Sequence, residues 1–103
     1  MILTNTPTIP GKEIREHFGL VSGSTVRAKH AGINFLSGLK QIVGGELSAY
    51  TDLLNEARDQ ALERMKAKAE DLGANAIVNI RFTTSEPAPG LAEIYTYGTA
   101  VKV

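Results

Sequence analysis

The chain has no cysteine among its 103 residues, and its only histidines are His17 and His30. The missing thiols exclude disulfide bonds, a cysteine nucleophile and thiolate metal ligands. Soft and borderline metals favour thiolate and imidazole, and the two histidines lack the short spacing of paired ligands. We therefore expect no resident cofactor, and a bound metal ion only where His17 or His30 joins ligands from distant segments or other subunits.

An excess of either charge is also absent, because 11 Lys and Arg residues balance 11 Asp and Glu residues. The basic residues are scattered, so no positive patch favours nucleic acid. No stretch approaches the roughly 18 consecutive apolar residues of a membrane span. The opening MILTNTPTIPGKEI lacks the pattern of a secretion signal. We expect a cytoplasmic protein without nucleic-acid or membrane partners.

Apolar residues make up 43% of the chain, enough for one domain with its own core over residues 1–103. Two helices are expected within it. The first begins at Asn34 and ends at Gly44, and the second begins around Glu46 to Ser48 and ends at Gly73. The apolar stripe of the second helix recurs at steps of three and four residues: Leu47, Tyr50, Leu54, Ala57, Ala61, Met65, Lys68 and Leu72.

Elsewhere the apolar residues alternate, which predicts strands. Residues 14–28 are expected to form a bent or bulged strand, or a hairpin, with its waist at Gly23. Residues 91–103 are expected to form a central or subunit-contact strand, because both faces carry apolar side chains. Pro7 and Pro10 favour an edge position for the N-terminal segment.

These elements predict an α+β fold in which two helices pack on a mostly antiparallel sheet. On the strand after the second helix, Ala76, Val78, Ile80 and Phe82 are expected to share one buried face. The predicted core comprises Leu39, Ile42, Leu54, Ala61, Met65, Val78, Ile80 and Phe82.

The combination of GL…IVGGE, Y…EAR…A…RM, A…LGANA and GTAV resembles the YbjQ-like family of small bacterial and archaeal proteins. The resemblance extends over nearly the whole chain. It implies a dodecin-like α+β subunit that assembles as a ring-shaped homopentamer. The family usually carries the label "putative heavy-metal-binding", and the resemblance implies no established biochemical activity.

The double glycine in IVGGELS raises the question of a phosphate-binding loop, but this stretch fits neither GxxxxGK[ST] nor GxGxxG. In the structural interpretation, Gly44 ends one helix and Gly45 permits the reversal. Glu46 then occupies the first turn of the next helix, where the helix dipole favours a carboxylate. In the functional interpretation, the joint lines a pocket between subunits, with Gly44, Gly45, Glu46 and Arg81 as candidate ligand-binding residues.

No motif carries a catalytic signature, and two classes of function remain. The first, which we favour, is a non-catalytic oligomeric binding or scaffold protein with a metal ion or small molecule between subunits. The second is an enzyme whose composite site uses His17, His30, Glu46 or Arg81 from different segments. For the oligomer, one contact patch is expected on Ile2 to Ile9.

Overall fold

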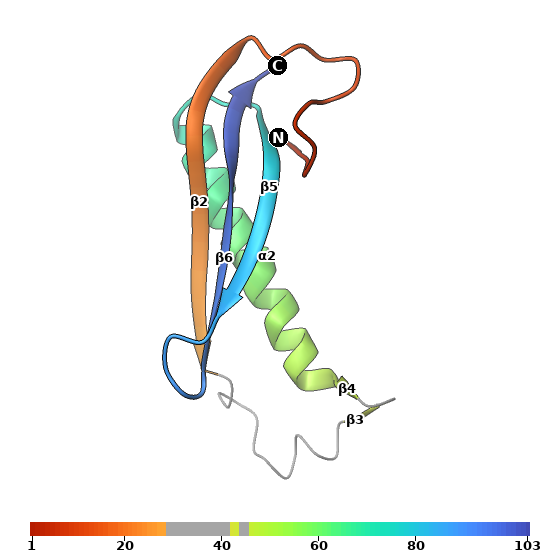
Figure 1. The fold of residues 1–103 in the computed structure, drawn as a ribbon, viewed down its shortest axis with the longest axis vertical. Coiled ribbons are helices and arrows are strands. Elements are labelled where there is room, and N and C mark those ends of the chain that lie inside the picture. Colours follow the sequence, from red (N-terminus) through yellow and green to blue (C-terminus); the bar gives the residue numbers. More distant parts are fainter. Residues whose placement is uncertain (29–41, 44–45) are drawn as a thin grey trace.

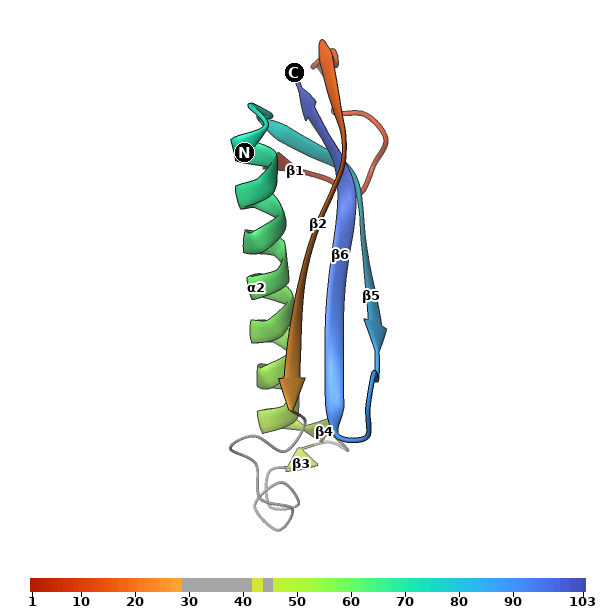
Figure 2. The ribbon, with the colours of Figure 1, turned by 90° about the vertical axis from the view of Figure 1, so that its left-hand side faces the viewer.

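The computed structural model describes residues 1–28, 42–43 and 46–103, and it has two layers, a sheet and a long helix (Figure 1). The elements are β1 (Ile2–Leu3), β2 (Glu16–Ala28), β3 (Ile42–Val43), β4 (Glu46–Leu47), α2 (Ser48–Asp71), β5 (Ala76–Ser85) and β6 (Leu91–Lys102). The main sheet has the order β1-β5-β6-β2, in which β1 is parallel to β5 and the other pairings are antiparallel. Figure 2 shows α2 lying along one side of this sheet. The predicted α+β class is confirmed.

The first predicted helix, Asn34 to Val43, lies mostly outside the described residues. Its last two residues are strand rather than helix, because Ile42–Val43 form β3 and pair antiparallel with Glu46–Leu47. Both side chains are β-branched, which favours extended backbone. The predicted helical positions of Ile42 and Val43 are therefore wrong. The predicted place of Glu46 in the first helical turn is wrong too, since α2 begins at Ser48.

The long helix α2 has 24 residues and is about 36 Å long at its usual rise per residue. Its side toward the sheet carries four fully buried side chains at steps of four residues: Ala57, Ala61, Met65 and Ala69. The predicted stripe is confirmed from Ala57 to Met65. It is wrong at Lys68 and Leu72, which are exposed, because the row continues to Ala69 and leaves Lys68 rotated by about 100°.

The helix ends where the sequence predicts, around Gly73. That residue has φ +90°, and its N–H donates to the carbonyl of Glu70 at 3.0 Å. The next N–H, of Ala74, donates to the carbonyl of Ala69 at 3.1 Å. Glycine adopts this left-handed conformation without the usual steric cost, so the turn leads directly into β5. No helix in the described part of the chain is long and apolar enough to cross a membrane.

The two layers approach each other closely at Gly23 of β2. A Cβ added there would lie 2.1 Å from the carbonyl oxygen of Ala61 and 2.6 Å from the backbone nitrogen of Met65. Only glycine leaves room for this approach of strand to helix. The predicted bend or bulge at Gly23 is misplaced, because the register of β2 shifts between His17 and Gly19 instead.

A bulge in β5 changes which side chains face the helix. The pairing of β5 with β6 shifts register between Val78 and Arg81, and Asn79 has a positive φ of 54°. Before the bulge, Val78 packs on the side away from α2, whereas Ile80 after it joins Met65 on the helix side. The predicted common face of Ala76, Val78, Ile80 and Phe82 is therefore wrong.

The predicted core is confirmed at Ala61, Met65, Val78 and Ile80, which are buried. Two other members differ: Leu54 is half-buried against Ala57 and Ala61, and Phe82 is 45% exposed beyond the bulge. Leu39 and the side chain of Ile42 lie outside the described part of the chain. The strand β6 is central in the sheet, as its two apolar faces predict.

Both ends of the chain attach to Asn75, which lies between α2 and β5. Its carbonyl accepts the N–H of Ile2 at 3.1 Å. The strand β1 that begins at Ile2 lies at the edge of the sheet, as the neighbouring prolines predict. The side-chain amide of Asn75 donates to the carbonyl of Val103 at 2.9 Å and accepts the N–H of Val103 at 2.8 Å. The two termini consequently lie toward the same end of the sheet (Figure 1).

Candidate functional site

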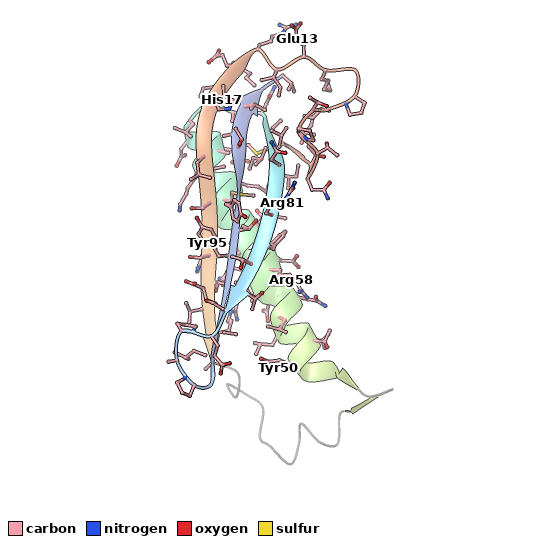
Figure 3. The ribbon with its side chains drawn as sticks, viewed as in Figure 1. Glu13, His17, Tyr50, Arg58, Arg81 and Tyr95 are labelled. Atoms are coloured by element: carbon pink, nitrogen blue, oxygen red, sulfur yellow. The ribbon has the colours of Figure 1, made fainter. Side chains whose placement is uncertain are left out.

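The residues singled out from the sequence do not gather in one place within the described chain. His30, Gly44 and Gly45 lie outside the described residues. Glu46 belongs to β4 at the start of the helix, whereas His17 lies near the opposite end of the molecule (Figures 1 and 3). Within one chain, the backbone positions of Glu46 and His17 are thus too far apart for a shared site.

Arg81 and His17 are also separated. Arg81 pairs across the sheet with Tyr97 and His17 with Val101, so their levels on β6 differ by four residues, or about 13 Å. The Arg81 guanidinium donates to the carbonyl oxygens of Asn5 at 2.8 Å and of Ile80 at 2.9 Å. Arg81 therefore ties the N-terminal segment to β5, a role that the sequence does not reveal.

Metal-ligating side chains are dispersed as well. Among residues 1–28, 42–43 and 46–103, no three side chains of His, Cys, Asp or Glu form a group that could hold a metal ion. His17 is exposed on β2 and belongs to no such group. The second predicted candidate ligand, His30, lies outside these ranges.

A further surface feature is the side of the sheet opposite α2, which we call the open face. Across it Leu20 pairs with Thr99 and Val26 with Glu93, and between them Ser22 and Ser24 pair with two tyrosines. These are Tyr97 and Tyr95, whose rings lie 5.6 Å apart at 33°. Leu20 is 72% exposed and Val26 52% exposed. The open face thus combines hydroxyl groups with exposed apolar side chains.

Near the chain termini the same side of the sheet is covered. Ile9 and Ile14 of the N-terminal segment pack there on Ala76, Val78 and Val101. This cover does not extend to Leu20 or Val26, as their exposure demonstrates. The open face therefore begins where the N-terminal segment ends its contact with the sheet.

On the helix side, a shallow pocket of about 320 Å³ lies between β1, α2 and β5. It is lined by Leu3, Thr4, Asn5, Leu62, Ile80 and Phe82. The bulge at Asn79 creates it by turning Ile80 and Phe82 toward the helix. Sequence reasoning missed this pocket because uninterrupted alternation hides the register shift.

A polar cluster joins β2 to α2, and we call it the seam. The buried hydroxyl of Thr25 donates to Gln60 Oε1 at 2.8 Å, and Arg27 Nη2 donates to the same oxygen at 2.9 Å. One helical turn further, Arg64 Nη1 donates to the carbonyl of Ser24 at 2.7 Å. The sequence offers only the four-residue spacing of Gln60 and Arg64 as a signal, and it does not indicate their strand partners.

Comparisons with known proteins agree with this fold. A UPF0145 protein of Hahella chejuensis is 59% identical over 101 residues, which cover 98% of this chain and 97% of that protein. A UPF0145 protein of Archaeoglobus fulgidus is 53% identical over 103 residues, which cover 100% and 95% respectively. A protein of unknown function from Pediococcus pentosaceus, assigned to the DUF74 family, has a crystal structure with a similar fold. Its TM-score is 0.66 at 18% sequence identity, and the match covers 100% of this chain and 97% of that chain. The sequence model described as "Putative heavy-metal-binding" matches residues 1–103, and the chain therefore belongs to the YbjQ-like family.

Proposed function

We propose that the chain is the subunit of a closed homo-oligomer, a pentamer, that binds a small ligand or a metal ion between subunits without catalysing a reaction. The observation that carries the oligomer is the open face. It exposes the large apolar side chains of Leu20 and Val26 on β2, and a second copy of the chain is a suitable cover for them. The number five follows the family resemblance.

The outer edge of β2 supports the same proposal. This strand has 13 residues, and none of the described strands pairs with its outer edge. Between Glu16 and Ala28 it carries neither proline nor lysine, the residues that commonly protect a free edge from pairing. Ring closure requires that one patch meets a different patch on the neighbour, and an edge and a face of this sheet supply two.

The proposed ligand is a metal ion or a small molecule held between subunits. The family description supplies the metal, and such an ion would need His17 and carboxylates from neighbouring subunits, because no three such side chains form a group within the described residues of one chain. We favour binding over catalysis because His17, Glu46 and Arg81 are dispersed within one chain. The compartment that we propose is the cytoplasm, which suits a chain without cysteine.

Native mass spectrometry of the untagged protein tests the assembly and the ligand together. We expect one dominant species of five subunits, and any retained metal or small molecule as added mass. A monomer as the dominant species, checked by analytical ultracentrifugation at the same concentration, would contradict the proposal.

A pair of variants tests the surface itself. Leu20→Lys combined with Val26→Lys places two charges on the open face, and we expect this variant to shift toward the monomer because charges are costly in an interface core. The matched control is Leu72→Lys, which replaces an exposed leucine at the end of α2. An undisturbed oligomer in the double variant would exclude the open face as the contact.

A further inference from the structure

The seam between β2 and α2 has a hydrogen-bonding pattern that the proposed assembly does not use. Gln60 Oε1 accepts two bonds, from Thr25 and from Arg27. An arginine side chain can only donate, so its bond identifies the accepting atom of Gln60 as oxygen and leaves the amide nitrogen on the other side. The Gln60 acceptor is therefore used, while its two N–H donors have no partner in the described chain.

The arginines of the seam add further donors. Arg27 and Arg64 each bond to a neutral oxygen, from Gln60 and from Ser24, and neither forms an ion pair with a described residue. Each guanidinium has five N–H groups, so most of them remain available. Gln60 and Arg64 are four residues apart and thus neighbours on the helix surface. The seam therefore presents N–H donors of Gln60, Arg27 and Arg64 together. The side-chain oxygen of Gln60 already accepts two bonds.

Charges around the seam also favour an anion at its Arg64 end. Lys68 lies one further turn along the same row of α2 and is exposed. Glu63, the acid next to Arg64 in sequence, pairs with Lys66 at 3.1 Å. The acid on this row, Glu56, lies one turn before Gln60, at the opposite end from Arg64 and Lys68.

We infer that the seam binds a phosphate-type oxyanion, held by the Gln60 amide and by the guanidinium groups of Arg27 and Arg64. Charge-assisted hydrogen bonds from arginine to such an anion are short and strong, and two guanidiniums supply bonds to several oxygens at once. The buried hydroxyl of Thr25 orients Gln60, so the donor arrangement exists before the anion arrives. The observations behind this site come from contacts within one chain and do not rest on the proposed oligomer, although Ser24, Thr25 and Arg27 belong to the strand whose outer edge the assembly would use.

The discriminating variant is Gln60→Glu. A carboxylate still accepts the bonds of Thr25 and Arg27, so the contact between β2 and α2 is retained. The outward amide donors are replaced by a negatively charged oxygen, which repels an anion. If the seam serves only to dock the helix, this substitution leaves phosphate titrations unchanged.

The probe is inorganic phosphate, titrated into the isotope-labelled full chain at constant ionic strength and followed by NMR. We expect saturable shifts of the Gln60 side-chain amide signals in the wild type, and of the neighbouring backbone amides, which can also be followed in Gln60→Glu, with a dissociation constant of about 1 mM or lower. Gln60→Glu and Arg64→Gln should each weaken binding about tenfold or more, as expected for the loss of charge-assisted bonds. An acetate titration tests for a carboxylate ligand instead, and tighter binding of acetate would overturn the phosphate assignment.

The matched control is Arg58→Gln, which removes the same charge from α2. Arg58 precedes Gln60 by two residues, so it points to the other side of the helix, where it donates to Asn55. We expect phosphate binding by this control within about twofold of the wild type, since exposed charges are strongly screened. Equal losses in Arg58→Gln and Arg64→Gln, or unchanged binding in Arg64→Gln, would overturn the site even if Gln60→Glu failed to fold.

Discussion

At the scale of single residues, the contact of Gly23 with α2 determines how closely the two layers pack. The carbonyl of Ala61 occupies the space that a side chain at position 23 would need. On the helix, Ala57, Ala61 and Ala69 are fully buried, and their short side chains project little toward the sheet. Small residues on both layers thus allow backbone to approach backbone, and even one methyl group is too large at this position.

We predict that Gly23→Ala loses about 2 kcal/mol or more of unfolding free energy, because the new methyl group overpacks the interface and forces the helix outward. Chemical denaturation measures the loss. Ser22→Ala, a change of the neighbouring residue on the open face, is the control and should stay within about 0.5 kcal/mol of the wild type. Equal stability of the Gly23→Ala variant would mean that the close approach does not exist.

At the scale of elements, the bulge in β5 organises the helix side of the sheet. It allows Ile77 and Ile80, three residues apart, to reach the same core cluster with Met65, whereas an unbroken strand would direct them to opposite faces. The N–H of Asn79 donates to the carbonyl of Thr6 at 3.0 Å, so the N-terminal segment holds the bulge in place. The pocket beside Phe82 depends on this single irregularity.

The positive φ of Asn79 makes the bulge testable. We predict that Asn79→Gly stays within about 1 kcal/mol of the wild-type stability, because glycine and asparagine tolerate this conformation. Asn79→Val should lose about 2 kcal/mol, because a β-branched side chain is strained there. Thermal unfolding of the two variants compares them directly, and identical midpoints would contradict the bulge.

The helix could be predicted from the sequence, whereas the bulge in β5 could not. The helix Ser48–Asp71 and its end at Gly73 follow from a local pattern that persists over several turns. The bulge at Asn79 depends on two partners distant in sequence, β6 and the segment around Thr6, so local alternation does not predict it. The seam is similar, because Arg27 and Gln60 lie 33 residues apart and neither shows a motif.

At the scale of the whole molecule, burial in the described residues comes from apolar clusters on both sides of the sheet. We predict that folding does not require a metal ion, so a strong chelator should leave the thermal midpoint unchanged. A structural metal would contribute its binding energy directly to folding. A fall of more than about 5 °C on chelation would contradict this prediction, because it corresponds to about 1 kcal/mol in a domain of this size.

The attachment of both termini to Asn75 has a consequence for engineering. Since Ile2 and Val103 both bond to that residue, a short peptide could join the last residue to the first without displacing either strand. The cyclic chain would have fewer unfolded conformations, while its folded state would change little. Head-to-tail ligation should accordingly raise the unfolding temperature, and the loop between β5 and β6 would offer a place to open the circle again as a permuted chain.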